Sequence, residues 1–348
     1  MKFLLSIILI LILISSPLLT FFVFSKSAYG DGLFMEQLSA SFGDRNADLL
    51  IKMNPPIVTT ETIKDQAQKP TVQFKLLDSK TNQTFKEVTY LITIEKDGKP
   101  LLSDWFFNPG GDLLIEMQPR NQNKISVYGE LDPILEAYTS REGSPVVASG
   151  PIFLDGGLYH FIVRIVTVDY SRTILPDDQQ PVFDGWLSIG AAKNANLTVD
   201  GKTIPTKVLS YYDEIGNITY NQPSNSINFT MPFNYDPERL DDPKNTVFIH
   251  QEVEVPKPSV LSADGAYQGY TNGKDVTNVL MVDGNNQTKD IIHFMLTKPV
   301  VQQISNEYLN KTNQTSADGL MTFSLVPSKN GSMAMGGAMN HTMPMMTQ

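Results

Sequence analysis

Apolar and polar residues alternate with a period of two along most of this chain, from about residue 48 to residue 326. In the segment 88–95 every second residue is large and apolar, and the run ends at Asp97-Gly98, a dipeptide typical of tight hairpin turns. Because successive side chains of a strand point to opposite faces, this pattern predicts strands that are buried on one side. Gly, Pro, Asn and Asp separate the runs at short spacing, which favours β-sandwiches over other folds.

The alternating segments fall into two groups, which predict two antiparallel Ig-like β-sandwich domains. Without its first 30 residues the chain keeps 318, more than the roughly 250–300 that one hydrophobic core usually serves. We place domain 1 at residues 31–192 and domain 2 at residues 193–326, with a protease-sensitive junction near 191–196.

One helix interrupts the β pattern of the second domain. Pro299 suits the first turn of a helix, and Val301, Ile304 and Tyr308 follow at a spacing of three to four residues. This spacing predicts one short helix near residues 299–310.

Residues 1–30 are interpreted as a secretory signal peptide. Lys2 precedes 22 uncharged residues, and Ala28-Tyr29-Gly30 places small residues at −3 and −1 of a cleavage site. An uncleaved anchor is the alternative, because 22 apolar residues can span a bilayer, although Ser15-Ser16-Pro17 weakens a continuous helix. We favour cleavage; under either interpretation the protein is extracytoplasmic, and it contacts the membrane only if the segment is retained.

Composition excludes some classes of binding partner and some types of site chemistry. The chain has no cysteine, which excludes disulfides, thiol catalysis and thiolate-ligated metal. Removing residues 1–30 takes away Lys2 and Lys26 and leaves 25 basic against 37 acidic side chains, a net charge of −12. Nucleic acids and anionic lipids are bound by clustered Lys and Arg, so cell-envelope proteins or glycans are the expected partners.

Asn-x-Ser/Thr sequons, which mark glycosylation sites in exported chains, are spread along the sequence. They predict a glycoprotein, and Asn228, which alternates with apolar neighbours, is expected on the outward face of a strand. The acceptors are Asn82, Asn196, Asn217, Asn228, Asn286, Asn310, Asn313, Asn330 and Asn340.

The last 22 residues, 327–348, are rich in methionine and glycine and predict a disordered tail. Thioether sulfur is a soft neutral ligand that suits Cu(I), so the tail is a candidate Cu(I) site; a tail that binds no metal is the alternative. The candidate ligands are Met333, Met335, Met339, His341, Met343, Met345 and Met346.

The remaining histidines lack the spacing of known metal motifs. On extended segments His250 shares a face with Glu252, and His293 alternates with Met295. If strands 246–255 and 290–297 pair, His250, His293 and Met295 meet and form a site. We favour ordinary surface or hydrogen-bonded roles for each histidine, His160 included.

No catalytic signature is present. The sequence has no Gly-x-Ser-x-Gly elbow, dinucleotide-binding glycine loop or Walker motif. The acidic segment 236–243 lacks calcium-loop spacing and contains Arg239, so we expect a solvated loop. We therefore expect that the protein is not an enzyme.

The stretches that carry a resemblance to known proteins are Phe74–Asp78, Asn82–Thr84, Val88–Gly98, Asp155–Phe161, Phe183–Gly190, Ser210–Asp213, Met231–Asn234 and His293–Met295. They resemble segments of a group of exported proteins of ammonia-oxidising archaea. The resemblance extends over most of the chain after residue 30, and it implies a cell-envelope location in a copper-dependent lineage. It implies no activity and no functional residue, and the Met-rich tail is not part of it.

These observations predict a non-enzymatic protein of the cell envelope with a candidate Cu(I)-binding tail. The alternative is a surface adhesin or a surface-layer-associated structural glycoprotein whose tail is inert. An enzyme acting on an extracellular polymer ranks third.

Overall fold

The computed structural model describes residues 33–64, 69–170, 173–243, 247–262, 266–283, 286–312 and 318–328. The fold is mostly β, as the alternation predicted, and the described residues form four sheets and few helices. The expected signal peptide and all but the first two residues of the expected tail lie outside these ranges. Within them, no helix has the length and apolar character needed to cross a membrane.

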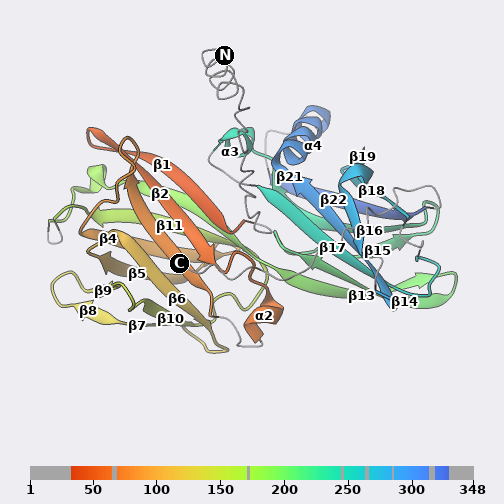
Figure 1. The fold of residues 1–348 in the computed structure, drawn as a ribbon, viewed down its shortest axis with the longest axis horizontal. Helices are drawn as coiled ribbons and strands as arrows, with labels where there is room; N and C mark the ends of the chain where they lie inside the picture. The colour runs from red at the N-terminus through yellow and green to blue at the C-terminus, as the bar shows by residue number, and fades with distance from the viewer. Residues whose placement is uncertain are drawn as a thin grey trace, which may run out of the picture.

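Twelve strands, β1 to β12, form two six-stranded sheets, and we call them the first strand set (Figure 1). One sheet has the order β1-β2-β3-β6-β10-β7 and the other β12-β11-β4-β5-β9-β8. The bounds are β1 Met35–Phe42, β2 Arg45–Asn54, β3 Thr71–Asp78, β4 Val88–Lys96, β5 Lys99–Asn108, β6 Asp112–Pro119, β7 Ser126–Tyr128, β8 Glu130–Asp132, β9 Ala137–Thr139, β10 Val146–Gly150, β11 Gly157–Thr167 and β12 Val182–Ile189. The short helix α2 (Thr60–Lys64) follows β2, and a 3₁₀ turn, η1 (Asp177–Gln179), precedes β12.

These two sheets share one hydrophobic core built from alternate residues of their strands. Strand β3 contributes Phe74 and strand β11 contributes Phe161, and their ring centroids lie 6.0 Å apart. Full burial of one such side chain contributes about 1.5–3 kcal/mol. The apolar side chains that the period-two pattern places on the inner faces therefore stabilise the packing of the two sheets.

Two strand pairs differ from the purely antiparallel arrangement that we predicted. Strand β10 runs parallel to β6, and β9 runs parallel to β5. Parallel neighbours need a crossover connection, and the segment 120–145 that precedes β10 holds only three-residue strands. Strands this short carry too few residues to show alternation, so the parallel pairs could not be predicted from the residue pattern.

The second strand set, β13 to β22, forms two five-stranded sheets, β13-β14-β17-β21-β20 and β15-β16-β22-β18-β19. Its bounds are β13 Ala191–Val199, β14 Lys202–Ser210, β15 Thr219–Asn221, β16 Ser226–Asn234, β17 Phe248–Pro256, β18 Tyr267–Thr271, β19 Lys274–Asp275, β20 Leu280–Asp283, β21 Lys289–Thr297 and β22 Asp318–Pro327. A 3₁₀ turn, η2 (Thr277–Val279), precedes β20. A second hydrophobic core lies between the two sheets.

Helix α4 (Lys298–Thr312) confirms the helix expected near residues 299–310. Val301 and Ile304 are buried in the second core, and the Tyr308 ring stacks on Tyr235 at 4.0 Å. The spacing of three to four residues places these side chains on one helix face.

The acidic segment 236–243 differs from the solvated loop that we expected. Residues Pro237–Asp241 form helix α3, and the Asp236 side chain caps it by accepting from Glu238 N at 3.0 Å. Aspartate at the N-cap and proline in the first turn both favour a helix start. Within α3, Leu240 is buried and the Arg239 side chain is only 16% exposed.

Gly190 is the single residue between β12 and β13, and the expected junction 191–196 is part of β13. That segment pairs residue by residue with β14. Gly190 N donates to the Val58 carbonyl and Thr60 N donates to the Gly190 carbonyl, each at 2.8 Å. A Cβ at Gly190 would lie 3.0 Å from the Ser210 carbonyl oxygen, so the backbone here is tightly packed.

The first described residue, Leu33, contacts both strand sets. Leu33 is fully buried in the second core, while its amide donates to Ser188 Oγ of β12 at 3.0 Å. Two residues after Leu33 the chain enters β1 of the first strand set. The start of the described chain therefore ties the two strand sets to each other.

Candidate metal centre

One face of the sheet β13-β14-β17-β21-β20 brings together three side chains of the types that coordinate metal ions. Alternate residues of β17 and β21 lie in the second core, so His250, Glu252 and His293 are on the opposite, outer face. The register places Glu252 opposite His293 and His250 opposite Met295. The strand pairing considered from the sequence is therefore confirmed, and it adds Glu252 to the group.

The three ligand atoms form a compact triangle. His250 Nε2 lies 3.0 Å from His293 Nδ1, and Glu252 Oε1 lies 3.6 Å from the first and 3.5 Å from the second. A point equidistant from all three is about 2.0 Å from each, and Zn²⁺ bonds to imidazole nitrogen and carboxylate oxygen are about 2.0–2.2 Å long. The spacing of the three atoms therefore fits one metal ion.

Tyr211, directly after β14, contacts two of these side chains. Its hydroxyl donates to Glu252 Oε1 at 2.9 Å, and its ring stacks on His250 with a centroid distance of 4.5 Å and an interplanar angle of 15°. Its amide also donates to the His250 carbonyl at 3.1 Å. Partners of this kind fix the orientation of metal ligands and tune their basicity.

The electrostatics favour an ionised carboxylate in the centre. Burial alone would raise the pKa of Glu252, but the hydrogen bond from His293, the electrostatic attraction to His250 and His293 and the hydrogen bond from Tyr211 outweigh it. The pKa of Glu252 is therefore below its ordinary value. Metal ligands must be deprotonated, so Glu252 is in its ligating form at neutral pH.

The neighbouring acid on the same face, Glu254, has different partners. Lys289 Nζ lies 2.6 Å from Glu254 Oε2, and Lys207 Nζ lies 3.8 Å from Glu254 Oε1. Lys207 also pairs with Glu61 of α2 at 3.2 Å. Lysines balance the charge of Glu254, whereas Glu252 faces two imidazoles.

Two imidazoles and one carboxylate are a donor set that suits zinc, copper, iron or nickel. Three protein ligands leave coordination positions open for water or a further donor. Among the described residues, these are the three side chains whose metal-binding atoms come within 4.8 Å of one another.

His160 does not join this centre. Its Nδ1 lies 3.4 Å from Glu95 Oε2 and its Nε2 lies 3.0 Å from Asp184 Oδ1. The ring stacks on Trp186 at 4.2 Å. Both ring nitrogens therefore have carboxylate partners, and His160 has the ordinary hydrogen-bonded role expected of it.

The metal ligands predicted in the tail lie outside the described residues. They are Met333, Met335, Met339, His341, Met343, Met345 and Met346. The same holds for the sequons at Asn313, Asn330 and Asn340.

The other six sequons divide by exposure. Asn82, Asn196, Asn217 and Asn310 are exposed, whereas Asn228 and Asn286 are half-buried. Asn228 Nδ2 donates to Ser226 Oγ at 3.0 Å, and Asn286 Oδ1 accepts from Thr288 N at 2.9 Å. Asn228 faces outward between the buried Ile227 and Phe229, as its alternation predicted.

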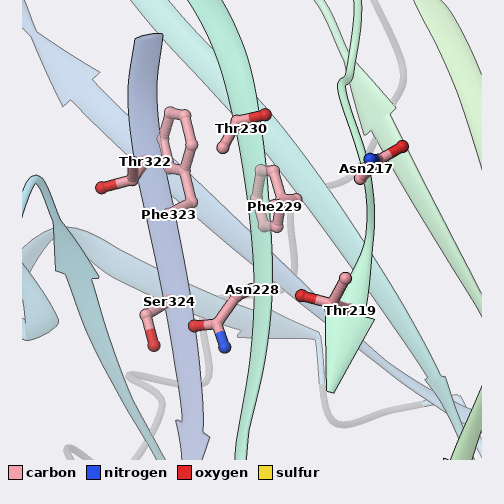
Figure 2. Close-up of a pocket in the computed structure, with 8 residues that line it drawn as sticks. All are labelled: Asn217, Thr219, Asn228, Phe229, Thr230, Thr322, Phe323 and Ser324. Atoms are coloured by element: carbon pink, nitrogen blue, oxygen red, sulfur yellow. The ribbon is translucent and has the colours of Figure 1, made fainter. Parts of the chain in front are cut away.

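Figure 2 shows a pocket of about 400 Å³ over strands β16 and β22, beside β15. It is formed by amides, hydroxyls and two stacked phenyl rings, and it includes the sequon acceptors Asn217 and Asn228. None of its side chains titrates near neutral pH, so the pocket offers hydrogen bonds without acid–base or metal chemistry. The lining residues are Asn217, Thr219, Asn228, Phe229, Thr230, Thr322, Phe323 and Ser324.

Comparison with known proteins adds no family assignment. No protein-family model matches the chain, and no curated protein matches it either.

Tyr211 was not predicted to be part of the centre. Tyr211 belongs to the run Ser210–Asp213, which carries no metal-binding pattern. Only the pairing of β14 with β17 brings it beside Glu252, and an aromatic hydroxyl at the end of a strand was the one available signal.

Proposed function

We propose that this chain is a non-enzymatic, extracytoplasmic cell-envelope protein that binds a transition-metal ion at His250, Glu252 and His293. The observation that carries the proposal is the triangle of two imidazole nitrogens and one carboxylate oxygen, spaced for bonds of about 2.0–2.2 Å. The Tyr211 contacts support it, because they hold Glu252 and His250 in place.

Sequence features support the location. The apolar N-terminal run, the absence of cysteine, the sequons and the net charge of −12 after residue 30 all suit a secreted glycoprotein. The resemblance to exported archaeal proteins points the same way. In this proposal each strand set is an Ig-like domain, with the metal centre on the second.

The test is a Zn²⁺ titration against a competing chromogenic chelator. The protein is the chain from Asp31 with the six tail methionines changed to leucine and His341 to glutamine; we call it the tail-substituted chain. It should bind one Zn²⁺. Changing a ligand by His250→Gln, Glu252→Gln or His293→Gln should weaken binding more than about 100-fold, because even partners of metal ligands contribute 10- to 100-fold.

His160→Gln is the matched control, because His160 is a half-buried strand histidine outside the centre. Its Zn²⁺ affinity should equal that of the tail-substituted chain, and circular dichroism should show native strand content in every variant. Equal Zn²⁺ binding by all variants, or no binding at all, would contradict the proposal. The adhesin interpretation then takes first place.

A further inference from the structure

We propose that the centre is a copper site, with Met295 supplying a thioether ligand for Cu(I) beside His250 and His293; this rests on the proposed function. The strand register brings these side chains together. Residues 250 and 252 of β17 and residues 293 and 295 of β21 form a block of four neighbours on one face. Three corners are the ligands described above, and Met295 is the fourth.

Met295 is within reach of the histidines. It is directly opposite His250 in the antiparallel pair β17–β21, and opposite residues have Cβ atoms about 4.5–5.5 Å apart. It also lies two residues from His293 on the same face of β21. Methionine is unbranched and flexible, so its sulfur can approach an ion held between the two imidazoles.

Met295 is partly accessible to solvent on this face. It is half-buried, between the core residues Phe294 and Leu296, whose side chains point the other way. A second methionine, Met281 of β20, is opposite His293 and is 38% exposed. Strand β21 separates β20 from β17 in the sheet, so Met281 is one strand further from His250 than Met295 is.

The type of donor atom determines which metal ion the centre prefers. Thioethers are soft ligands that favour Cu(I), whereas carboxylates favour harder ions, and imidazole serves both copper and zinc. The same centre therefore holds Zn²⁺ through His250, His293 and Glu252, and Cu(I) through His250, His293 and Met295. Cu(I) accepts three such neutral donors without a carboxylate.

Two substitutions separate these donor sets, and both are tested in the tail-substituted chain with Cu(I) and Zn²⁺ and a chromogenic chelator for each ion. Met295→Leu should lower Cu(I) affinity about tenfold or more and leave Zn²⁺ affinity within about twofold, because only the soft ligand is lost. Glu252→Gln should lower Zn²⁺ affinity and leave Cu(I) affinity within about twofold, because only the carboxylate ligand is lost. Leucine replaces methionine at low cost in stability, so the first variant is expected to fold.

Met281→Leu is the matched control and should leave Cu(I) affinity unchanged. A Cu(I) loss in Met281→Leu rather than Met295→Leu would overturn the assignment of Met295. Unchanged Cu(I) affinity in Met295→Leu, with Zn²⁺ binding still dependent on the histidines, would overturn the copper inference and leave the metal centre standing. If His250→Gln lowers the affinity for neither Cu(I) nor Zn²⁺, both the copper inference and the proposed metal centre are overturned.

Discussion

Arg239 Nη2 donates to Glu36 Oε1 at 2.9 Å, and this buried salt bridge joins α3 of the second strand set to β1 of the first across 203 sequence positions. The Glu36 side chain is 3% exposed and that of Arg239 is 16% exposed. The second carboxylate oxygen of Glu36 accepts from the Trp186 amide at 2.5 Å. Glu36 therefore links both strand sets through one carboxylate.

We predict that Glu36→Gln destabilises the chain strongly. Removing one partner of a buried ion pair costs about 3–5 kcal/mol, because the other charge keeps its desolvation penalty. Chemical denaturation measures this loss. Asp169→Asn, which breaks the exposed Arg45–Asp169 pair, should cost less than about 1 kcal/mol; equal losses in the two variants would contradict the structural role of Glu36.

The raised pKa of Asp213 leads us to predict that the stability of the chain depends on pH. Burial raises its pKa to about 6, so between about pH 4 and pH 6 the folded state binds more protons than the unfolded state. The free energy of unfolding should therefore fall as the pH rises through this window. Asp213→Asn should remove this decline and stabilise the chain at pH 7 by about 3 kcal/mol, because each pKa unit corresponds to about 1.4 kcal/mol.

Denaturation at pH 4, 5, 6 and 7 tests the Asp213 prediction. Asp97→Asn is the matched control, because Asp97 also lies near Lys96 but its side chain is 74% exposed. The prediction is contradicted if the free energy of unfolding changes with pH in Asp213→Asn as it does in the unsubstituted chain. It is also contradicted if this pH dependence is reduced in Asp97→Asn alone.

Exposure predicts which sequons carry glycans. Asn82, Asn196, Asn217 and Asn310 should be occupied, since their side chains are exposed, whereas Asn228 should be unmodified because it lies within β16 between two paired strands. Mass spectrometry of glycopeptides from the native host measures occupancy. A fully occupied Asn228 with empty exposed sequons would refute this order.

The tail makes a separate prediction about Cu(I). The chain from Asp31 with its native tail should take up more Cu(I) than the tail-substituted chain, because six thioethers are replaced by leucine, while Zn²⁺ uptake should be the same. Changing His341 alone should only weaken the difference. Equal Cu(I) uptake by both chains would show that the tail is not a copper site.

Local pattern predicted the strands well and their partners poorly. The alternation at 88–95, the Asp97-Gly98 turn and the helix after Pro299 all rest on neighbouring residues, and the structure has each of them. The parallel pairs and α3 were missed. Parallel pairing depends on contacts between distant segments, and α3 is a five-residue helix that is also held by Arg239 contacting Glu36.

The dependence on strand pairing also explains why the metal centre was predicted only in part. The face shared by His250 and Glu252 follows from residue spacing, and the meeting with His293 was predicted only on the condition that two strands pair. Whether β17 lies beside β21, and in which register, depends on the whole sheet. A shift of one residue would send His293 into the core, so the spacing of the histidines alone could not decide the site.

The most direct measurement is anomalous diffraction at the zinc edge from crystals of the tail-substituted chain grown with Zn²⁺. We predict a strong peak at bonding distance, about 2.0–2.2 Å, from His250 Nε2, His293 Nδ1 and Glu252 Oε1, and we expect its loss in His293→Gln. A native fold with no anomalous peak at these three atoms would contradict it.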